Sequence, residues 1–468
     1  MDLALFCLQY GFLSQTVRII RKGARSVFNK LFFKNSAVVI SANFLPSIAS
    51  LLLIPLIINK VGVDDFGVFS VLLGFILVLS TLDLGANRAV TKFGCDWIED
   101  NKGFAALFYS LILTLMFGVF LAVGLFLCKD IIILNLFDEV SGARLGEIRQ
   151  TIIYFAISAP FMVSIPSLNA FLEYCGKFKT VSFIKVPSQI SLLLFIYIFS
   201  DDFQTAFFYI LLIKVLHFGA LVVVSISMVE LKINFDKEAF SELFRFNVWL
   251  SADNLISPFL AYAERFVISS LISVSVVAYF TTNYDLVSKI LLLTGSMMTV
   301  IFPMLNRFNN QEKVKLYSKS INLMLIVLTP VVLGIILISN FLLEFWVNSE
   351  FAENSYMTLN ILAVGAFFLA LSNVPFSALH SKGKTKTTTV IHIVELLFYY
   401  PTLFFLIRKF GVNGAALTWS LRCFIDFLLM DFWTRCHMKI NKFGQYYLIL
   451  AIALMFVFTV YMKLLMHE

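Results

Sequence analysis

The sequence has very little charge for its length. Only 14% of its 468 residues are charged, whereas 60% are hydrophobic and the mean hydropathy is +0.89. Soluble domains carry about 25% charged residues, so this composition excludes an ordinary soluble protein. The apolar runs reach about 20 residues, the length with which an α-helix crosses the hydrocarbon core of a membrane. They lack the two-residue alternation of porin strands, which favours an all-α polytopic membrane protein.

Cysteine is also scarce. The six Cys residues are scattered and form no CxxC pair, so the spacing indicates neither a redox motif nor a cysteine metal site. We interpret them as small buried apolar residues. The formal net charge of +7 does not call for a nucleic-acid partner, because the Lys and Arg residues follow the membrane topology described next.

The apolar runs predict thirteen spans. Residues 1–35 precede them and combine six Lys and Arg residues with Phe and Leu, as in a basic amphipathic segment that lies on membrane lipids. The approximate spans are 36–60, 66–94, 104–128, 150–172, 181–200, 204–230, 244–271, 275–305, 317–345, 356–380, 387–408, 413–434 and 444–466.

Positive charge is unequally divided between the two sides of this topology. The loops on the side of the N-terminus hold 24 of the 36 Lys and Arg residues, and the opposite loops hold 7. By the positive-inside rule the N-terminus is cytoplasmic, and the thirteenth span places the C-terminus outside.

Short matching stretches indicate an internal repeat. The sequence GKFKT at 176–180 returns as GKTKT at 383–387, and Phe69 matches Phe280 at nearly the same offset. We therefore predict two six-helix lobes related by a pseudo-twofold axis along the membrane normal, plus one extra C-terminal helix. The predicted parts are a basic cytoplasmic or interfacial segment at 1–35, an N-lobe at 36–230, a cytoplasmic linker at 231–243, a C-lobe at 244–434, and a cytoplasmic loop with the extra span at 435–468.

Several charges remain inside the predicted spans, where a charge at the bilayer centre costs about 2.5–3.5 kcal/mol. Such groups are expected to face a wet cavity or one another. Two pairs, Asp285 with Lys289 and Arg422 with Asp426, have the four-residue spacing of helical ion pairs. The basic residues are Lys185, Lys214, Arg265, Lys289 and Arg422, and the acids include Asp83, Asp253, Glu264, Asp285, Glu395, Asp426 and Asp431.

Two interpretations of the basic residues stay open, a lining for an anionic substrate and a set of structural ion pairs. They are equally supported for Lys289 and Arg422, which have acids one turn away. Lys214 and Arg265 lack an acid at helical spacing in their own spans, which favours substrate binding. His217 shares a face with Lys214 and fits either a satisfied buried imidazole or a proton relay.

Asp83 and Arg88 lie near the cytoplasmic end of the second span. Five residues separate them, so they are poorly placed to bridge along one helix, and Asn87 is a better partner for Asp83. Arg88 fits an interfacial anchor and a contact with an anionic headgroup equally well.

Four stretches carry a family resemblance over about 36–434. They are NFLPSIASLLLIPLIINKVGVDDFGVFS at 43–70, LDLGANRAVTKF at 82–93, RFVISSLISVSVVAYFTTNYDL at 265–286 and the Phe-Pro pair at 302–303. In these the chain resembles the Wzx-type polysaccharide flippases of the multidrug, oligosaccharidyl-lipid and polysaccharide exporter superfamily.

The resemblance implies a function without covalent chemistry. It implies a flippase of the bacterial inner membrane that carries an undecaprenyl-diphosphate-linked oligosaccharide, such as an O-antigen or capsule repeat unit, by alternating access. Association with a glycan polymerase and a chain-length regulator is an expectation of the same kind. No cofactor is expected beyond H⁺ or Na⁺ coupling. The expected substrate contacts are Arg88, Lys214, Arg265, Lys289 and Arg422, and the candidates for ion coupling are Asp83, Glu264 and Asp285.

Two other functions are weighed against this one. A cation-coupled drug antiporter of the same superfamily calls for an acidic cavity, but 36–58 in the first span contains no acid. A membrane-embedded glycosyltransferase or polymerase calls for a large external loop or paired acids with a metal. The longest predicted external loop, 129–149, is short and has no obvious paired-acid motif.

Overall fold

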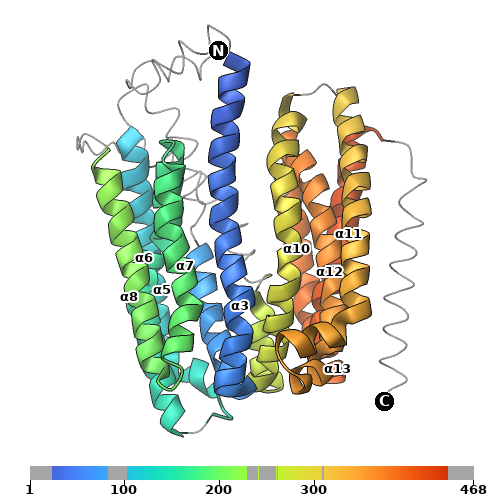
Figure 1. Ribbon diagram of the computed structural model, residues 1–468. Coiled ribbons are helices and arrows are strands. Elements are labelled where there is room, and N and C mark those ends of the chain that lie inside the picture. The colour runs from blue at the N-terminus through green and yellow to red at the C-terminus, as the bar shows by residue number, and fades with distance from the viewer. Residues whose placement is uncertain are drawn as a thin grey trace. The chain divides into compact units, whose positions relative to one another are not determined.

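Long α-helices make up the protein. The computed structural model describes residues 24–82, 103–140, 142–228, 241, 260, 262–307 and 310–440, and none of these residues lies in a strand. This confirms the all-α prediction. Helices suit a membrane protein because each helix pairs its backbone N–H and C=O groups within its own segment, where hydrocarbon offers no water. A short helix covers 262–271. The labelled helices are α3 (Ala24–Thr81), α5 (Gly103–Leu136), α6 (Gly142–Tyr174), α7 (Phe178–Ile198), α8 (Phe203–Ile226), α10 (Val274–Arg307), α11 (Asn310–Trp346), α12 (Ser349–Ser381) and α13 (Thr385–Met438) (Figure 1).

Two of the helices, α3 and α13, are each broken by a glycine. Gly62 in α3 has φ 84° and Gly411 in α13 has φ 56°, a backbone region that residues with a Cβ rarely adopt. The first break falls between the predicted spans 36–60 and 66–94, and the second between 387–408 and 413–434. Each of these helices is therefore two arms, here called the first and second arm.

The described helices establish a multi-pass membrane protein. Eight of them are long and apolar enough to cross a membrane, and α3 and α13 are among the eight. Most of the predicted span 244–271 and all of 444–466 lie outside the described residues. The count of thirteen spans therefore stays a prediction.

The chain divides into two compact units, each assembled from separate segments. The first unit comprises residues 1–50, 75–133 and 141–258, and the second comprises 51–74, 134–140 and 259–468. Most of α5 and all of α6, α7 and α8 belong to the first unit. The second unit holds α10 to α13 and also the part of α3 around its break. The predicted lobe boundaries stay predictions.

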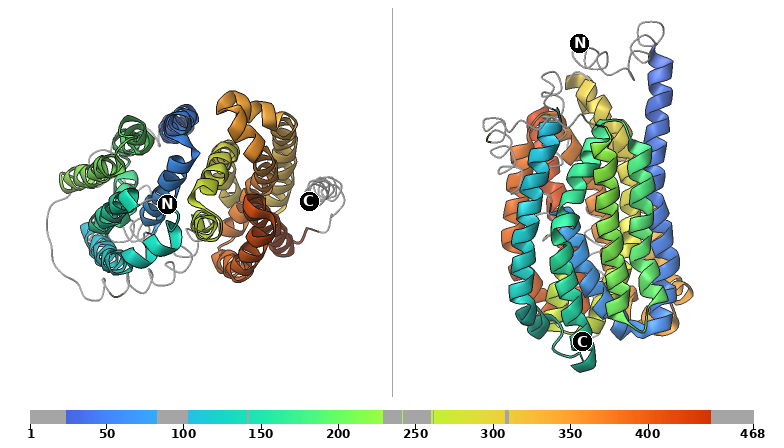
Figure 2. Two further views of the ribbon diagram at one scale, coloured as in Figure 1. Left: turned by 90° about the horizontal axis from the view of Figure 1, so that it is seen from below. Right: turned by 90° about the vertical axis from the view of Figure 1, so that its left-hand side faces the viewer.

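In the first unit, α7 and α8 run alongside each other and α6 packs against α8 (Figure 2). Helix α8 begins at its N-cap Asp202, whose carboxylate accepts hydrogen bonds from the backbone N–H and the hydroxyl of Thr205. The hydroxyl bond, more than the other contacts, lowers the pKa of Asp202 below its ordinary value. Between α5 and α6 the Thr114 hydroxyl donates to Ser164 Oγ at 3.1 Å.

In the second unit, α12 packs against α10, α11 and α13. Hydrogen bonds from polar side chains stabilise these helix contacts. Asn283 of α10 donates to the Ser355 carbonyl at 3.0 Å, and Ser420 of α13 donates to the Ile361 carbonyl at 2.8 Å. Such bonds replace those that water would make outside the membrane.

The internal repeat is visible in the backbone of two turns. After α6, the N–H of Lys177 donates to the Leu172 carbonyl at 2.8 Å, and after α12 the N–H of Lys384 donates to the Leu379 carbonyl at 3.0 Å. Both turns contain a glycine with positive φ, 75° at 176 and 69° at 383. These are the bonds of a Schellman C-cap, and both the donors and the acceptors are 207 residues apart. The match between GKFKT and GKTKT therefore reflects one repeated helix-ending turn.

A close approach of α5 to α6 generates a stability prediction. A Cβ at Gly118 would lie 2.3 Å from the Cα of Pro160, whereas a Cβ at Gly124 of the same helix meets nothing within 4 Å. We expect Gly118→Leu to destabilise the protein by about 1–3 kcal/mol relative to Gly124→Leu, since overpacking forces the helices apart. Thermal unfolding of both purified variants in detergent measures the difference. Equal melting temperatures would contradict the close approach.

Candidate functional site

Six of the eight charged residues predicted for the site lie within the described part of the chain. Lys214 belongs to the first unit, and the other five belong to the second. Asp83 and Arg88 lie outside the described residues, so their roles stay predictions. The five in the second unit are Glu264, Arg265, Asp285, Lys289 and Arg422.

The first unit contains a basic pair on α8, formed by Lys214 and His217. Both residues are buried, with 7% and 6% of their surface exposed. Neither ring nitrogen of His217 has a hydrogen-bond partner in the described residues, and both interpretations of this histidine stay predictions. Lys185 of α7 adds a further positive charge nearby. The α8 basic pair can therefore still donate hydrogen bonds to an anion.

The second unit contains a network around Tyr399 of α13. The Tyr399 hydroxyl donates to Oε1 of Glu264, and both side chains are buried. On the other side, the guanidinium carbon of Arg422 lies 5.7 Å from the centre of the Tyr399 ring. Arg422 Nε is buried without a partner in the described residues. Tyr399 thus satisfies the acid and leaves Arg422 with unused donors.

Arg265 directs its guanidinium toward backbone and an aromatic ring. Its Nη1 donates to the Ser70 carbonyl at 3.3 Å, and its guanidinium carbon lies 5.7 Å from the centre of the Tyr262 ring. It makes no ion pair with a carboxylate of the described residues. A guanidinium has five N–H donors, so most of its capacity stays available to a phosphate or carboxylate.

The two ion pairs predicted from four-residue spacing have different outcomes. Lys289 Nζ lies 2.8 Å from Oδ2 of Asp285, which confirms the first pair. The predicted pairing of Arg422 with Asp426 is wrong. Arg422 instead contacts Tyr399 and lies 3.9 Å from the sulfur of Cys423, while Asp426 accepts a hydrogen bond from Ser372 of α12. Arg422 therefore contacts the first arm of α13 and Asp426 contacts α12, in place of the pair that helical spacing predicts.

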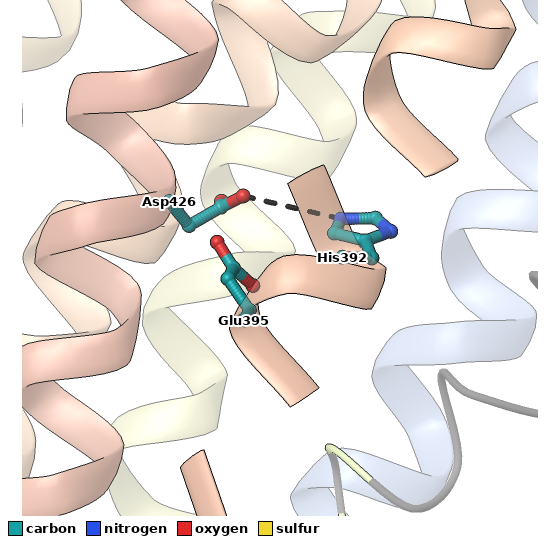
Figure 3. A group of neighbouring side chains, drawn as sticks. All are labelled: His392, Glu395 and Asp426. Atoms are coloured by element: carbon teal, nitrogen blue, oxygen red, sulfur yellow. Dashed lines mark ion pairs between the residues drawn. The ribbon is translucent and has the colours of Figure 1, made fainter. Parts of the chain in front are cut away.

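The structure also brings together three residues that the sequence did not group, namely His392, Glu395 and Asp426 (Figure 3). The first two lie on the first arm of α13 and the third on the second arm. The three-residue spacing of His392 and Glu395 on one apolar helix was a usable signal, because it places both on one face. The contribution of Asp426 depends on the break at Gly411 and could not be read from spacing.

The geometry therefore offers cationic donors to an anion in both units. Lys214 in the first unit and Arg265 and Arg422 in the second have donors that no described acid uses. Such donors can form charge-assisted hydrogen bonds with an anion.

Eight described helices of this length and apolar character define a multi-pass membrane protein. The chain belongs to the family described as "Polysaccharide biosynthesis protein", whose match covers residues 32–309. This confirms the resemblance inferred from the sequence.

Individual relatives agree in length and fold. A Shigella flexneri protein named "Putative O-antigen transporter" is 28% identical over 412 residues, which cover 85% of this chain and 96% of that protein. A structure of the lipid II flippase MurJ, in an inward closed conformation, has a TM-score of 0.70 at 14% identity and covers 92% of this chain and 98% of its own. An inward-facing multidrug resistance transporter of the MATE family has a TM-score of 0.65 at 16% identity, covering 87% and 100%. At these identities the two structures show a shared fold.

The hydrogen bond from Tyr399 to Glu264 generates a prediction. Tyr399→Phe leaves a buried carboxylate without its donor, which costs about 1–3 kcal/mol. We expect a lower melting temperature in detergent. Tyr400→Phe is the matched control, because the Tyr400 hydroxyl makes no hydrogen bond with a described residue. If both variants melt at the wild-type temperature, the bond does not stabilise the second unit.

Proposed function

We propose that this protein flips an undecaprenyl-diphosphate-linked oligosaccharide across the bacterial inner membrane by alternating access. The observation that carries the proposal is the set of buried or half-buried cations without an acid partner in the described residues, Lys214 and Arg265 above all. A diphosphate offers several oxygens to such donors. The family match and the name of the Shigella flexneri relative support a glycan cargo on a lipid carrier. The fold shared with the lipid II flippase MurJ supports the same class.

The orientation belongs to the proposal. The excess of Lys and Arg in the loops on the side of the N-terminus supports a cytoplasmic N-terminus. Cargo then enters from the cytoplasmic leaflet, where the lipid-linked unit is assembled. The identity of the sugars, O-antigen or capsule, is set by contacts other than these basic residues. Association with a glycan polymerase and a chain-length regulator, which would receive the flipped unit, is part of the proposal.

A drug antiporter is less well supported although MATE transporters share the fold. Of the acids predicted for the site, Glu264 is hydrogen-bonded to Tyr399 and Asp285 is paired with Lys289. Arg265 and Arg422 lie close to Glu264, and their positive charges repel a cationic drug.

Replacement of Arg265 tests the cargo role. Loss of charge-assisted hydrogen bonds worth about 1.5–3 kcal/mol corresponds to a reduction of roughly 10- to 100-fold in transport efficiency for Arg265→Ala. Arg265→Lys keeps the charge without the planar fork and is expected to fall in between. The measurement is complementation of a deletion strain, with the cytoplasmic lipid-linked oligosaccharide quantified at matched protein levels. Lys129→Ala, which removes a charge of α5 that is already paired with Asp130, is the control. Full transport by Arg265→Ala would contradict the cargo role.

Ion coupling is a separate part of the proposal. Asp285 and Glu264 are the described acids through which a counterflow of H⁺ or Na⁺ would act, because both lie close to the basic residues. In proteoliposomes with purified protein, we expect flipping to slow at least tenfold when ionophores collapse both gradients. Asp285→Asn should then flip slowly with or without a gradient. Unchanged flipping after collapse would remove coupling and leave the cargo assignment intact.

A further inference from the structure

His392, Glu395 and Asp426 form a compact cluster inside the second unit. One ligand atom from each, the imidazole nitrogen or a carboxylate oxygen, lies within 4.8 Å of the others. Glu395 and Asp426 are buried, with 5% and 6% of their surface exposed, and the ring of His392 is 22% exposed. In Figure 3 the two carboxylates face each other and the imidazole faces Asp426. The cluster shares no residue with the basic groups assigned to the cargo.

The carboxylates of this cluster have oxygens without a partner in the described part of the chain. Neither oxygen of Glu395 has a hydrogen-bond partner there, and the same holds for Oδ1 of Asp426. Arg422 turns to Tyr399 and makes no ion pair with either acid. His392 Nε2 lies 3.9 Å from Asp426 Oδ1, beyond hydrogen-bond distance. Two facing carboxylates in an apolar interior cannot both stay ionised without a cation, since each buried charge otherwise costs several kcal/mol.

We propose that His392, Glu395 and Asp426 bind a divalent first-row transition-metal ion of the Zn²⁺ class. The donor set of one imidazole nitrogen and two carboxylate oxygens suits these ions, whereas Mg²⁺ and Ca²⁺ prefer oxygen alone. Two carboxylates supply two negative charges, which a dication neutralises and a single monovalent ion does not. Three protein ligands with one open position are a common zinc arrangement.

The surroundings of Asp426 orient its carboxylate for metal binding. Ser372 of α12 donates to Oδ2 of Asp426 at 2.5 Å, which holds the carboxylate and leaves Oδ1 turned to the cluster. Hydrogen bonds of this kind orient the ligands of metal sites. Tetrahedral bonds of 2.0–2.2 Å place ligand atoms about 3.4 Å apart. Side-chain rotations that bring the ligand atoms about 1.4 Å closer together are therefore sufficient.

A metal in this place would connect the two arms of α13 across the break at Gly411. His392 and Glu395 come from the first arm and Asp426 from the second, and Ser372 extends the contact to α12. The bound ion would stabilise this helical hairpin, because a ligand that binds only the folded state raises its stability.

The test uses the full-length protein in detergent, with any affinity tag removed, after treatment with a chelator and desalting. Zn²⁺ is titrated, bound zinc is measured by elemental analysis after gel filtration, and the melting temperature is recorded. We expect one saturable Zn²⁺ per chain and a melting temperature that rises with Zn²⁺ concentration. Glu395→Gln and His392→Asn are each expected to weaken binding at least tenfold and to abolish most of the thermal shift.

Matched controls separate this site from other ligands in the chain. His437→Asn removes a histidine from the same helix, and Glu344→Gln removes an exposed acid from α11. Both should bind Zn²⁺ as the wild type does. Because the His392 ring is partly exposed, its variant remains informative if Glu395→Gln does not fold. Zinc binding unaffected by either cluster variant, no saturable zinc binding, or binding of Na⁺ alone would overturn the proposal.

Discussion

Hydrocarbon offers no water to a polar group, and this constraint governs both the backbone and the charges of the protein. The backbone meets this constraint by forming labelled helices of 21 to 58 residues, in which backbone N–H and C=O groups pair with one another. Gly62 and Gly411 break α3 and α13 into two arms each, and Gly176 and Gly383 lie in the C-cap turns that end α6 and α12. Side chains answer it by pairing across helices, as Asn283 does with the Ser355 carbonyl. Within the described residues, a polar side-chain atom that is buried without a partner has a cost that calls for an explanation.

Most of these atoms belong to neutral side chains, and the ionisable groups among them differ in sign. They include His217 and Arg422, which offer donors or positive charge, and Glu395 and Asp426, which offer acceptors. Where the protein can satisfy a charge it does so, as with Asp285 and Lys289 or with Tyr399 and Glu264. A structural network alone would be expected to join Arg422 to Asp426, which lie one helical turn apart. Instead each turns away, the arginine to an aromatic ring and the acid to a serine. The arrangement keeps both signs open for ligands from outside the chain.

What the sequence predicts correctly here depends on local periodicity. The apolar runs locate α5 to α8 and α10 to α13, and the majority of the predicted ends lie within a few residues of the observed ones. This works because a membrane span is defined by its own length and composition. The Asp285–Lys289 pair follows from helical geometry alone. The bond between Tyr399 and Glu264 joins residues 135 positions apart, so no spacing rule finds it. His392, Glu395 and Asp426 meet only because α13 folds back at Gly411. The sites of this protein therefore depend mostly on contacts between residues far apart in the sequence, whereas the spans depend mostly on local sequence.

Arg422 connects the two kinds of unpartnered group. Its charge is felt by Glu395 and by Glu264 as well as by the ring of Tyr399. With Glu395 and Asp426 both ionised, their negative potential offsets the attraction of Arg422 for an anion. A dication bound by His392, Glu395 and Asp426 would neutralise that negative potential. Arg422 would then attract an anionic cargo more strongly. The cargo proposal and the metal proposal therefore predict opposite effects of removing Arg422. Removal of Arg422 should lower cargo affinity but strengthen metal binding, since it eliminates a positive charge close to the bound cation.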